Sequence, residues 1–173
     1  MNTTDQATLE ALAERLGVLL RSAGQTVATA ESCTGGWVGW VQHASEELTP
    51  GSPAWYDRGF VTYSYASKSD LLGVPAQLIA TRGAVSEAVA LAMADGALSH
   101  SVADWSVAIT GIAGPDGGTP DKPVGTVCFA WAGRDGMRAT RTCCFVGHRA
   151  EVRAQAVATA LTGLIERAGR LLA

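Results

Sequence analysis

The sequence predicts a single three-layer α/β/α domain built on a mixed sheet of about five strands. Helical segments flank and interrupt about five short strand-like runs, and the last two of these runs are separated only by a turn. A closing hairpin is antiparallel, so the sheet that contains it is mixed. The 173 residues are enough for one domain with a hydrophobic core and too few for two ordinary ones, so we expect residues 1–173 to form one domain.

The first half of the chain begins with a predicted helix over residues 4–21. Thr3 and Gln6 match a capping box at its start, Gly24 is expected to end it, and one face carries Leu9, Leu12, Leu16, Leu19 and Leu20. A strand follows over residues 26–30, and a second helix begins at Trp37. Residues 43–57 are polar and contain two prolines, which predicts a loop before a second strand over residues 59–64.

The second half alternates helices with three further strands. A short segment that contains Lys68 ends at residues 71–75, and Ser86 is expected to cap a helix over residues 87–98. Strands are predicted over residues 105–109, 124–131 and 138–145, with a Gly/Pro-rich loop at 110–123 and a turn at 133–136. The last helix is expected over residues 148–172. The residues of these two helices that we expect to face the core are Val89, Ala90, Met93, Ala97, Val157, Ala160, Leu161, Leu164, Ala168 and Leu171.

Composition excludes several classes of function. The net charge of −3 provides no electrostatic footprint for nucleic acid, and no apolar run is long enough to span a membrane. The N-terminal residues lack the basic and apolar regions of a signal peptide, so we expect a cytoplasmic protein.

Neither a metal nor a cofactor is expected. No two cysteines form a Cys-x-x-Cys pair, and the histidines are scattered along the chain at His43, His100 and His148. Three of the four cysteines are expected to be small buried side chains on strands: Cys128, Cys143 and Cys144.

Residues 30–36, Ala-Glu-Ser-Cys-Thr-Gly-Gly, stand where the first strand ends and the second helix begins. Unpaired backbone N–H groups gather at such a junction and favour negative charge, and glycine lets a ligand approach the backbone closely. A nucleophile here, Ser32 or Cys33, would have oxyanion donors beside it. The same residues also suit a simple helix N-cap, and this motif alone leaves both interpretations open.

Three loops follow strand ends and could meet at one edge of the sheet, where open α/β folds bind ligands. They are the Ser32 junction, residues 63–68 and residues 110–122. The third is glycine-rich but is not a P-loop, because no Gly-Lys-Ser/Thr follows the glycines. It can cradle an anion with backbone amides or form a structural turn. Asp116 and Asp121 have no carboxylate partner at a telling spacing, so no carboxylate pair is expected.

Ser32 and Lys68 would form a nucleophile–base pair of a recognised kind. A free lysine has a pKa near ~10.4, so burial or a neighbouring cation would have to lower the pKa, at about 1.4 kcal/mol per unit. The alternative is that Lys68 is an ordinary solvated lysine.

Two further pairs share a helix face. Arg149 and Arg153 lie four residues apart at the start of the last helix, where they either bind an anion or remain exposed to solvent. Trp37 and Trp40 lie three apart, and they either stack on an aromatic ligand or, as is more common, pack in the core or at a subunit contact.

The order of these motifs resembles that of the CinA C-terminal domain family. The resemblance rests on the 30–36 segment, on Gly-Phe-Val-Thr-Tyr-Ser at 59–64 with Lys68, and on Leu-Gly-Val at 72–74. It continues through Gly-Ala-Val-Ser-Glu at 83–87, Thr-Gly-Ile-Ala-Gly-Pro-Asp-Gly-Gly at 110–118, Lys-Pro-Val-Gly-Thr at 122–126 and Gly-His-Arg at 147–149. These segments together span nearly the whole chain.

The resemblance implies a three-layer α/β fold and nicotinamide-nucleotide amidase activity. Such a hydrolase converts the carboxamide of nicotinamide mononucleotide to nicotinate mononucleotide and ammonia, in pyridine-nucleotide (NAD) salvage. We accordingly expect a small-molecule substrate, no metal, no cofactor, and no nucleic-acid or membrane partner; a homo-oligomer is left open. Some members carry an additional N-terminal domain, which we do not expect within these 173 residues.

Carried over by position, Ser32 matches the nucleophile and Lys68 its base. Tyr63 and Thr110 match residues that position groups or relay protons, and Arg149 matches a phosphate ligand. Backbone N–H groups of residues 33–36 are expected to stabilise the oxyanion. The remaining expected substrate contacts come from the two glycine-rich loops: Cys33, Thr34, Gly35, Gly36, Gly111 and Gly114.

Three positions depart from the family's usual pattern. Residues 65–67, Tyr-Ala-Ser, stand where Asn-Glu-Ala is usual, so the local polar contacts to Lys68 are expected to differ. His148 replaces the acid of a Gly-Asp-Arg motif, and Trp37 stands where smaller apolar residues are common. None of these changes removes an expected catalytic group.

A second interpretation comes from another functional class: a non-catalytic nucleotide-sensing or protein-interaction domain on the same scaffold. A fold alone does not exclude it. The presence of Ser32, Lys68 and Tyr63 favours the amidase. In that mechanism Ser32 attacks the amide carbon, while Lys68 takes the proton and passes it to the leaving ammonia.

Overall fold

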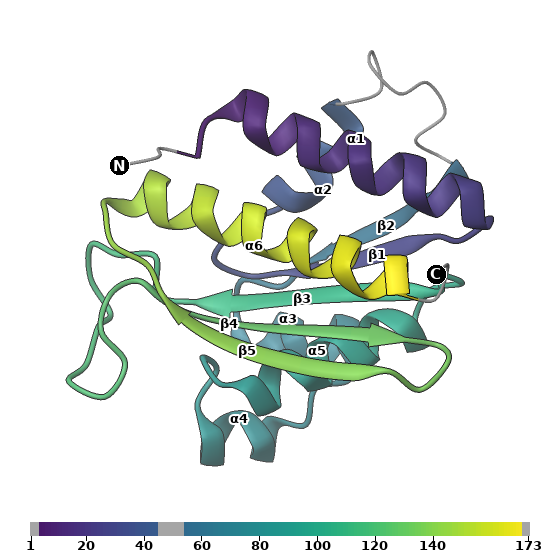
Figure 1. Cartoon of the computed structure of the whole chain (residues 1–173). Helices are drawn as coiled ribbons and strands as arrows, with labels where there is room; N and C mark the ends of the chain where they lie inside the picture. Colours follow the sequence, from purple (N-terminus) through teal and green to yellow (C-terminus); the bar gives the residue numbers. More distant parts are fainter. Residues whose placement is uncertain (1–3, 45–53, 171–173) are drawn as a thin grey trace.

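The computed structural model describes residues 4–44 and 54–170, which form a five-stranded sheet between two layers of helices (Figure 1). The strand order is β2-β1-β3-β4-β5. The central strand pair, β1 (Val27–Glu31) and β3 (Trp105–Gly111), is parallel, and β2 (Tyr56–Val61) also runs parallel to β1. β4 (Thr126–Gly133) and β5 (Arg138–Cys144) continue the sheet in antiparallel pairing. The mixed α/β/α architecture predicted from the sequence is therefore confirmed.

The helices divide between the two faces of the sheet (Figure 1). One face is covered by α1 (Gln6–Ala23), α2 (Trp37–Ala44) and α6 (Arg149–Arg170). The other is covered by α3 (Tyr65–Leu72), α4 (Ala76–Arg82) and α5 (Glu87–Ser99). Strand side chains alternate between the faces, so large residues such as Ile109 and Trp131 meet α1 and α6, while small residues such as Ala108 and Ala130 meet α5.

Capping residues set several helix ends. Gly24 and Gly73 end α1 and α3 in the left-handed conformation, and Ser86 caps α5 with its side chain, as predicted for Gly24 and Ser86. The predicted capping box at the start of α1 is wrong. Asp5 is the N-cap and accepts a hydrogen bond from the Thr8 N–H, and Gln6 donates to Glu10 instead; Thr3 lies outside the described residues.

Three elements differ from the prediction. α3 begins at Tyr65, inside the segment 63–68 that was predicted as a loop. β2 begins at Tyr56, within the predicted loop, and ends at Val61, because an edge strand needs only backbone pairing with β1 and can leave its polar residues half-buried, as Tyr56 and Asp57 are, or exposed, as Arg58 is. α4 was not predicted, since seven residues with only Ile79 buried carry no periodic stripe. Residues 45–53 of the predicted loop, and Leu171 of the predicted stripe, lie outside the described residues. The other nine core positions expected on α5 and α6 are all buried.

The cysteine prediction holds in part. Cys128 is buried on β4, whereas Cys143 is half-buried and Cys144 is exposed, because both lie on the edge strand β5. No helix within the described residues is both long and apolar enough to cross a membrane.

Candidate active site

The three loops predicted to meet do so at the ends of β1, β2 and β3. Together with part of the segment between α4 and α5, they surround a pocket of about 190 Å³. Most of the expected site residues line this pocket. The residues that line it are Ser32, Cys33, Tyr63, Tyr65, Lys68, Ala84, Val85, Thr110, Gly111, Ala113 and Arg149.

The Ser32 and Lys68 side chains contact each other in this pocket. Ser32 follows β1 and is held by a hydrogen bond from its N–H to the Ile109 carbonyl, 3.0 Å. Lys68 Nζ donates to Ser32 Oγ at 3.1 Å and to the carbonyl of Thr62 at 2.6 Å. The Thr62 carbonyl can accept a hydrogen bond from either the charged or the neutral amine, so it orients Nζ toward Ser32 in both states.

Lys68 is only 1 % exposed, which excludes the solvated-lysine alternative. A capping box between Ser64 and Ser67 begins α3, and Gly73 ends it, so this short helix is fixed at both ends with Lys68 pointing inward. Burial lowers the pKa of Lys68, because an ammonium loses its hydration in the protein interior. That shift increases the neutral fraction, which is the form that can accept a proton.

The Cys33 thiol lies beside Ser32 and is buried. Burial raises the pKa of Cys33 to about 12, so the thiol stays protonated at neutral pH. This environment suits an inert side chain more than a nucleophile.

Backbone N–H groups at the junction provide candidate oxyanion donors. Gly35 N–H already bonds to the Ser32 carbonyl at 3.0 Å. Within the described residues, the N–H groups of Cys33, Thr34 and Gly36 donate to no backbone carbonyl. Gly35 and Gly36 have φ angles of 62° and 89°, a conformation that a residue with a Cβ adopts only with strain.

Glu31 is a site residue that the sequence analysis missed. It is 1 % exposed, and its carboxylate accepts hydrogen bonds from the N–H groups of Val38 (3.0 Å) and Gly39 (2.9 Å) and from the hydroxyls of Thr34 (2.7 Å) and Thr29 (3.3 Å). The start of α2 is therefore capped by a carboxylate of the protein. Strand alternation was the available signal, since Val27, Thr29 and Glu31 share one face of β1.

Arg149 reaches the pocket from the first position of α6. Its Nη1 donates to the Gly114 carbonyl at 2.8 Å, and its Nη2 donates to the Tyr63 hydroxyl at 3.4 Å. Tyr63 is 66 % exposed, so this pair lies at the open side of the pocket. Gly114 thus contacts the guanidinium through its carbonyl and does not itself line the pocket.

Arg153, unlike Arg149, does not line the pocket and contacts the junction before α2 and the first residue of that helix. Its Nη2 donates to the Thr34 carbonyl at 2.6 Å, and its guanidinium lies 5.2 Å from the centre of the Trp37 ring. Trp37 therefore stacks on a side chain of this protein, while Trp40 is 53 % exposed on the same helix. Neither tryptophan lines the pocket, and neither do Thr34, Gly35 or Gly36.

Thr110 lies at the part of the pocket lining that residues 84 and 85 form. Its side chain is 1 % exposed, and Oγ1 donates to the Ala84 carbonyl at 2.8 Å. It therefore supports the segment that contributes Ala84 and Val85 to the pocket.

A sequence profile of the CinA C-terminal domain matches residues 9–168. The chain belongs to the CinA C-terminal domain family. The resemblance seen in the motifs is thereby confirmed.

Some relatives of this CinA-family chain are named as nicotinamide-nucleotide amidohydrolases. The chain is 52 % identical over 155 residues to the nicotinamide-nucleotide amidohydrolase PncC of Escherichia coli strain K12, which covers 88 % of this chain and 90 % of that protein. It is 49 % identical over 158 residues to the Pseudomonas putida protein of the same name, covering 90 % and 94 %. The crystal structure of the competence/damage inducible protein CihA from Agrobacterium tumefaciens aligns with a TM-score of 0.87 at 44 % identity, covering 91 % of this chain and 94 % of that one.

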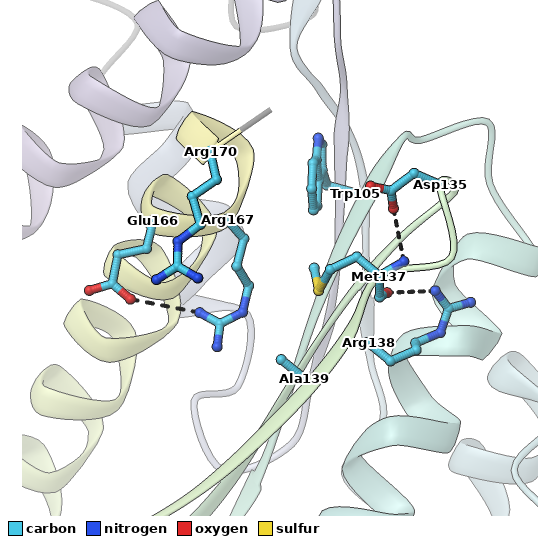
Figure 2. Close-up of a pocket in the computed structure, with 8 residues that line it drawn as sticks. All are labelled: Trp105, Asp135, Met137, Arg138, Ala139, Glu166, Arg167 and Arg170. Carbon is cyan, nitrogen blue, oxygen red and sulfur yellow. Dashed lines mark hydrogen bonds and ion pairs between the residues drawn. The ribbon is translucent and has the colours of Figure 1, made fainter. Parts of the chain in front are cut away.

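A larger pocket of this CinA-family chain, about 340 Å³, lies at the other end of β3, between α6 and the β4–β5 hairpin (Figure 2). Several of its charged groups already have partners. Asp135 accepts from the Met137 N–H, Arg138 pairs with Asp95, and Glu166 lies 3.8 Å from Arg167. It contains neither Ser32 nor Lys68, so the smaller pocket remains the candidate active site.

Proposed function

We propose that the protein is a nicotinamide-nucleotide amidohydrolase that converts nicotinamide mononucleotide to nicotinate mononucleotide and ammonia by a Ser–Lys mechanism. The observation that carries the mechanism is the 3.1 Å hydrogen bond between Lys68 Nζ and Ser32 Oγ in a buried position. The substrate assignment is supported by two relatives named as nicotinamide-nucleotide amidohydrolases, at about half identity over most of both chains. No observation favours the non-catalytic alternative.

In the first half of the reaction, Ser32 Oγ attacks the carboxamide carbon while the neutral amine of Lys68 takes the hydroxyl proton. The developing oxyanion accepts a hydrogen bond from the N–H group of Cys33, which lines the pocket beside Ser32. The C–N bond then breaks, and Lys68 passes its proton to the departing nitrogen. Ammonia and an ester on Ser32 result, and Lys68 is neutral again.

In the second half, Lys68 takes a proton from water, whose oxygen attacks the ester carbon. The bond to Ser32 breaks, and Lys68 returns the proton to Ser32 Oγ. Nicotinate mononucleotide leaves, with one water consumed overall. Both steps use the same base, which is why the position of Nζ, between Ser32 and the Thr62 carbonyl, matters twice.

Substrate orientation in this proposal depends on charge. The phosphate lies at the open side of the pocket, where Arg149 offers charge-assisted hydrogen bonds and Tyr63 contacts the same guanidinium. The pyridinium ring then lies nearer Lys68, and its positive charge further favours the neutral amine. Remote binding of the phosphate can thus contribute to catalysis as well as to affinity.

The proposal also covers the setting of the enzyme. The nucleophile and the base are both side chains, so no metal or cofactor is required, and residues 1–173 act as one catalytic domain. We place the reaction in the cytoplasm, as a step of NAD salvage.

The test is to incubate the purified protein with nicotinamide mononucleotide and measure ammonia and nicotinate mononucleotide. We expect both products in equal amounts, an unchanged rate in EDTA, and no product from Ser32→Ala. Absence of ammonia from the wild-type protein would contradict the proposed activity. Loss of activity in EDTA that zinc restores would contradict the metal-free mechanism.

A further inference from the structure

We propose that Lys122 is a positioning residue of the reaction pocket: its ammonium group ties residues 82–85, which carry Ala84 and Val85 of the pocket wall, to the 112–125 loop between β3 and β4. The readout of this inference rests on the proposed amidohydrolase function. The chain contains two lysines, Lys68 and Lys122, beside many arginines. Both donate to backbone carbonyl groups next to the same pocket.

The contacts of Lys122 concentrate on one short segment. Its Nζ donates to the Val85 carbonyl at 2.7 Å and to the Arg82 carbonyl at 3.2 Å. Together with the bond from Thr110 to the Ala84 carbonyl, three of the four carbonyl groups in residues 82–85 are held by side chains from β3 and the loop that follows it. Gly83, at φ 77°, makes room: a Cβ there would lie 3.3 Å from Lys122 Nζ.

The loop itself aims the lysine. Thr119 N–H donates to the Lys122 carbonyl at 2.9 Å, and Lys122 N–H donates to Thr119 Oγ1 at 3.1 Å, so these two residues close a tight turn. Near the other end of the loop, the Gly114 carbonyl accepts the hydrogen bond from Arg149. The loop therefore connects two parts of the pocket lining, Arg149 through the Gly114 carbonyl and Val85 through Lys122.

The expected consequence is on substrate binding. Without the ammonium, residues 82–85 keep the bonds from Thr110 to Ala84 and from Ser86 to Gly83 but lose the two from Lys122, and the wall has to be ordered when the substrate binds. That ordering reduces affinity for the substrate. The Ser32–Lys68 pair makes no contact with Lys122, so the pH dependence of the chemical step is unaffected.

The experiment compares Lys122→Met with Lys122→Arg in the full-length protein. For Lys122→Met we expect KM for nicotinamide mononucleotide to rise roughly tenfold, as loss of one or two hydrogen bonds implies, with a smaller change in kcat. In Lys122→Arg, which keeps the positive charge and hydrogen-bond donors, KM should stay close to the wild-type value. Hydrogen exchange of the 82–87 amides, measured without substrate, should be faster in Lys122→Met than in wild type.

Arg134→Met is the matched control. Arg134 also ties a loop through backbone carbonyls, those of Leu98, Ser101 and Ala103, but it lies at the opposite end of β3 from the pocket. We expect this variant to lower the melting temperature and to leave KM unchanged. If Lys122→Met does not fold, Thr119→Val tests the same clamp by releasing the turn that aims the lysine, and its KM should rise.

Two results would overturn the inference: an unchanged KM together with unchanged exchange at residues 82–87 in the folded variant, or an equal rise of KM in Arg134→Met. Failure of the proposed function is a separate result, because it appears as no ammonia from the wild-type protein. The exchange measurement needs no turnover, so it tests the clamp in either case.

Discussion

Lys68 Nζ lies 3.1 Å from Ser32 Oγ, although Ser32 follows β1, Lys68 lies on α3, and the two residues are 36 positions apart in the chain. Ser32 is fixed by the parallel pairing of β1 with β3, and Lys68 by the capped helix α3. The carbonyl of Thr62, which follows β2, accepts a second hydrogen bond from the Lys68 amine and holds that amine beside Ser32. Three adjacent strand ends thus converge on one proton-transfer path.

Ser32→Ala should abolish nearly all turnover, whereas Cys33→Ala should keep most of it. A thiol is intrinsically the better nucleophile, but burial raises the pKa of Cys33 to about 12, so little thiolate exists at neutral pH. The hydrogen bond that Lys68 makes is to the serine hydroxyl. The check is steady-state ammonia release from both variants at matched folded concentration. The reverse pattern would assign the nucleophile to Cys33.

Activity should fall as the pH is lowered, with an apparent pKa below the lysine value of ~10.4. Burial lowers the pKa of Lys68, so the neutral amine persists to lower pH than in a free lysine. Below that pKa the amine is protonated and cannot accept the serine proton, so the rate drops about tenfold per pH unit. The measurement is kcat against pH with a stable substrate.

Lys68→Arg provides the companion variant. Arginine keeps the positive charge but does not lose its proton near neutral pH, so turnover should be lost even where the protein folds. Circular dichroism and binding of substrate to the variant separate loss of chemistry from loss of structure. Wild-type turnover in this variant would mean that the base is another group.

The sequence predicted most elements because their ends carry local chemical signals. Gly24, Ser86 and the hairpin turn at 133–136 each fix a boundary through backbone geometry or a cap. β2 was misplaced because edge pairing imposes no hydrophobic pattern on Tyr56, Asp57 and Arg58. α4 was missed since it is short and buries one side chain, so tertiary packing defines it more than its own sequence does.

The site was less accessible to sequence reasoning than the fold. The meeting of the three loops followed from the rule about strand ends, but the distance between Ser32 and Lys68 depends on tertiary packing. Glu31 was missed because a carboxylate between small residues is normally assigned to the surface. Only its four donors, supplied by β1, the junction and α2, reveal why the charge is buried.

Glu31→Gln should destabilise the protein by about 1–3 kcal/mol, the cost of leaving buried hydrogen-bonding groups unpaired. The amide keeps one acceptor oxygen, while its NH₂ group would face the N–H of Val38 or Gly39. For a chain of this size that corresponds to a fall in melting temperature of roughly 2–4 °C per kcal/mol. Turnover should fall as well, because the same contacts hold the junction that presents Ser32.

Glu87→Gln is the matched control for this prediction. Glu87 also accepts hydrogen bonds from two hydroxyls, those of Thr140 and Thr142, but its carboxylate is exposed to solvent. Water can replace these partners, so the melting temperature should change little. Equal destabilisation in both variants would show that burial of Glu31 is not the cause.

Arg149→Ala should weaken catalytic efficiency on nicotinamide mononucleotide by about 1.5–3 kcal/mol, the range for a hydrogen bond to a charged group. Arg149 also donates to the Gly114 carbonyl, so part of any loss could come from a displaced loop. A cycle with the phosphate-free riboside separates the two effects. Loop displacement affects both substrates, whereas loss of the phosphate contact affects the mononucleotide alone.

The cycle compares kcat/KM for mononucleotide and riboside in wild type, Arg149→Ala and Arg153→Ala. The riboside should already be a poor substrate for wild type, since it lacks the charge that Arg149 binds. Arg153 contacts the Thr34 carbonyl and Trp37 outside the pocket. Its removal should therefore lower kcat/KM for both substrates by the same factor. Arg149→Ala should reduce the mononucleotide much more than the riboside. An equal loss on both substrates would mean that Arg149 supports the loop through Gly114 and that another group binds the phosphate.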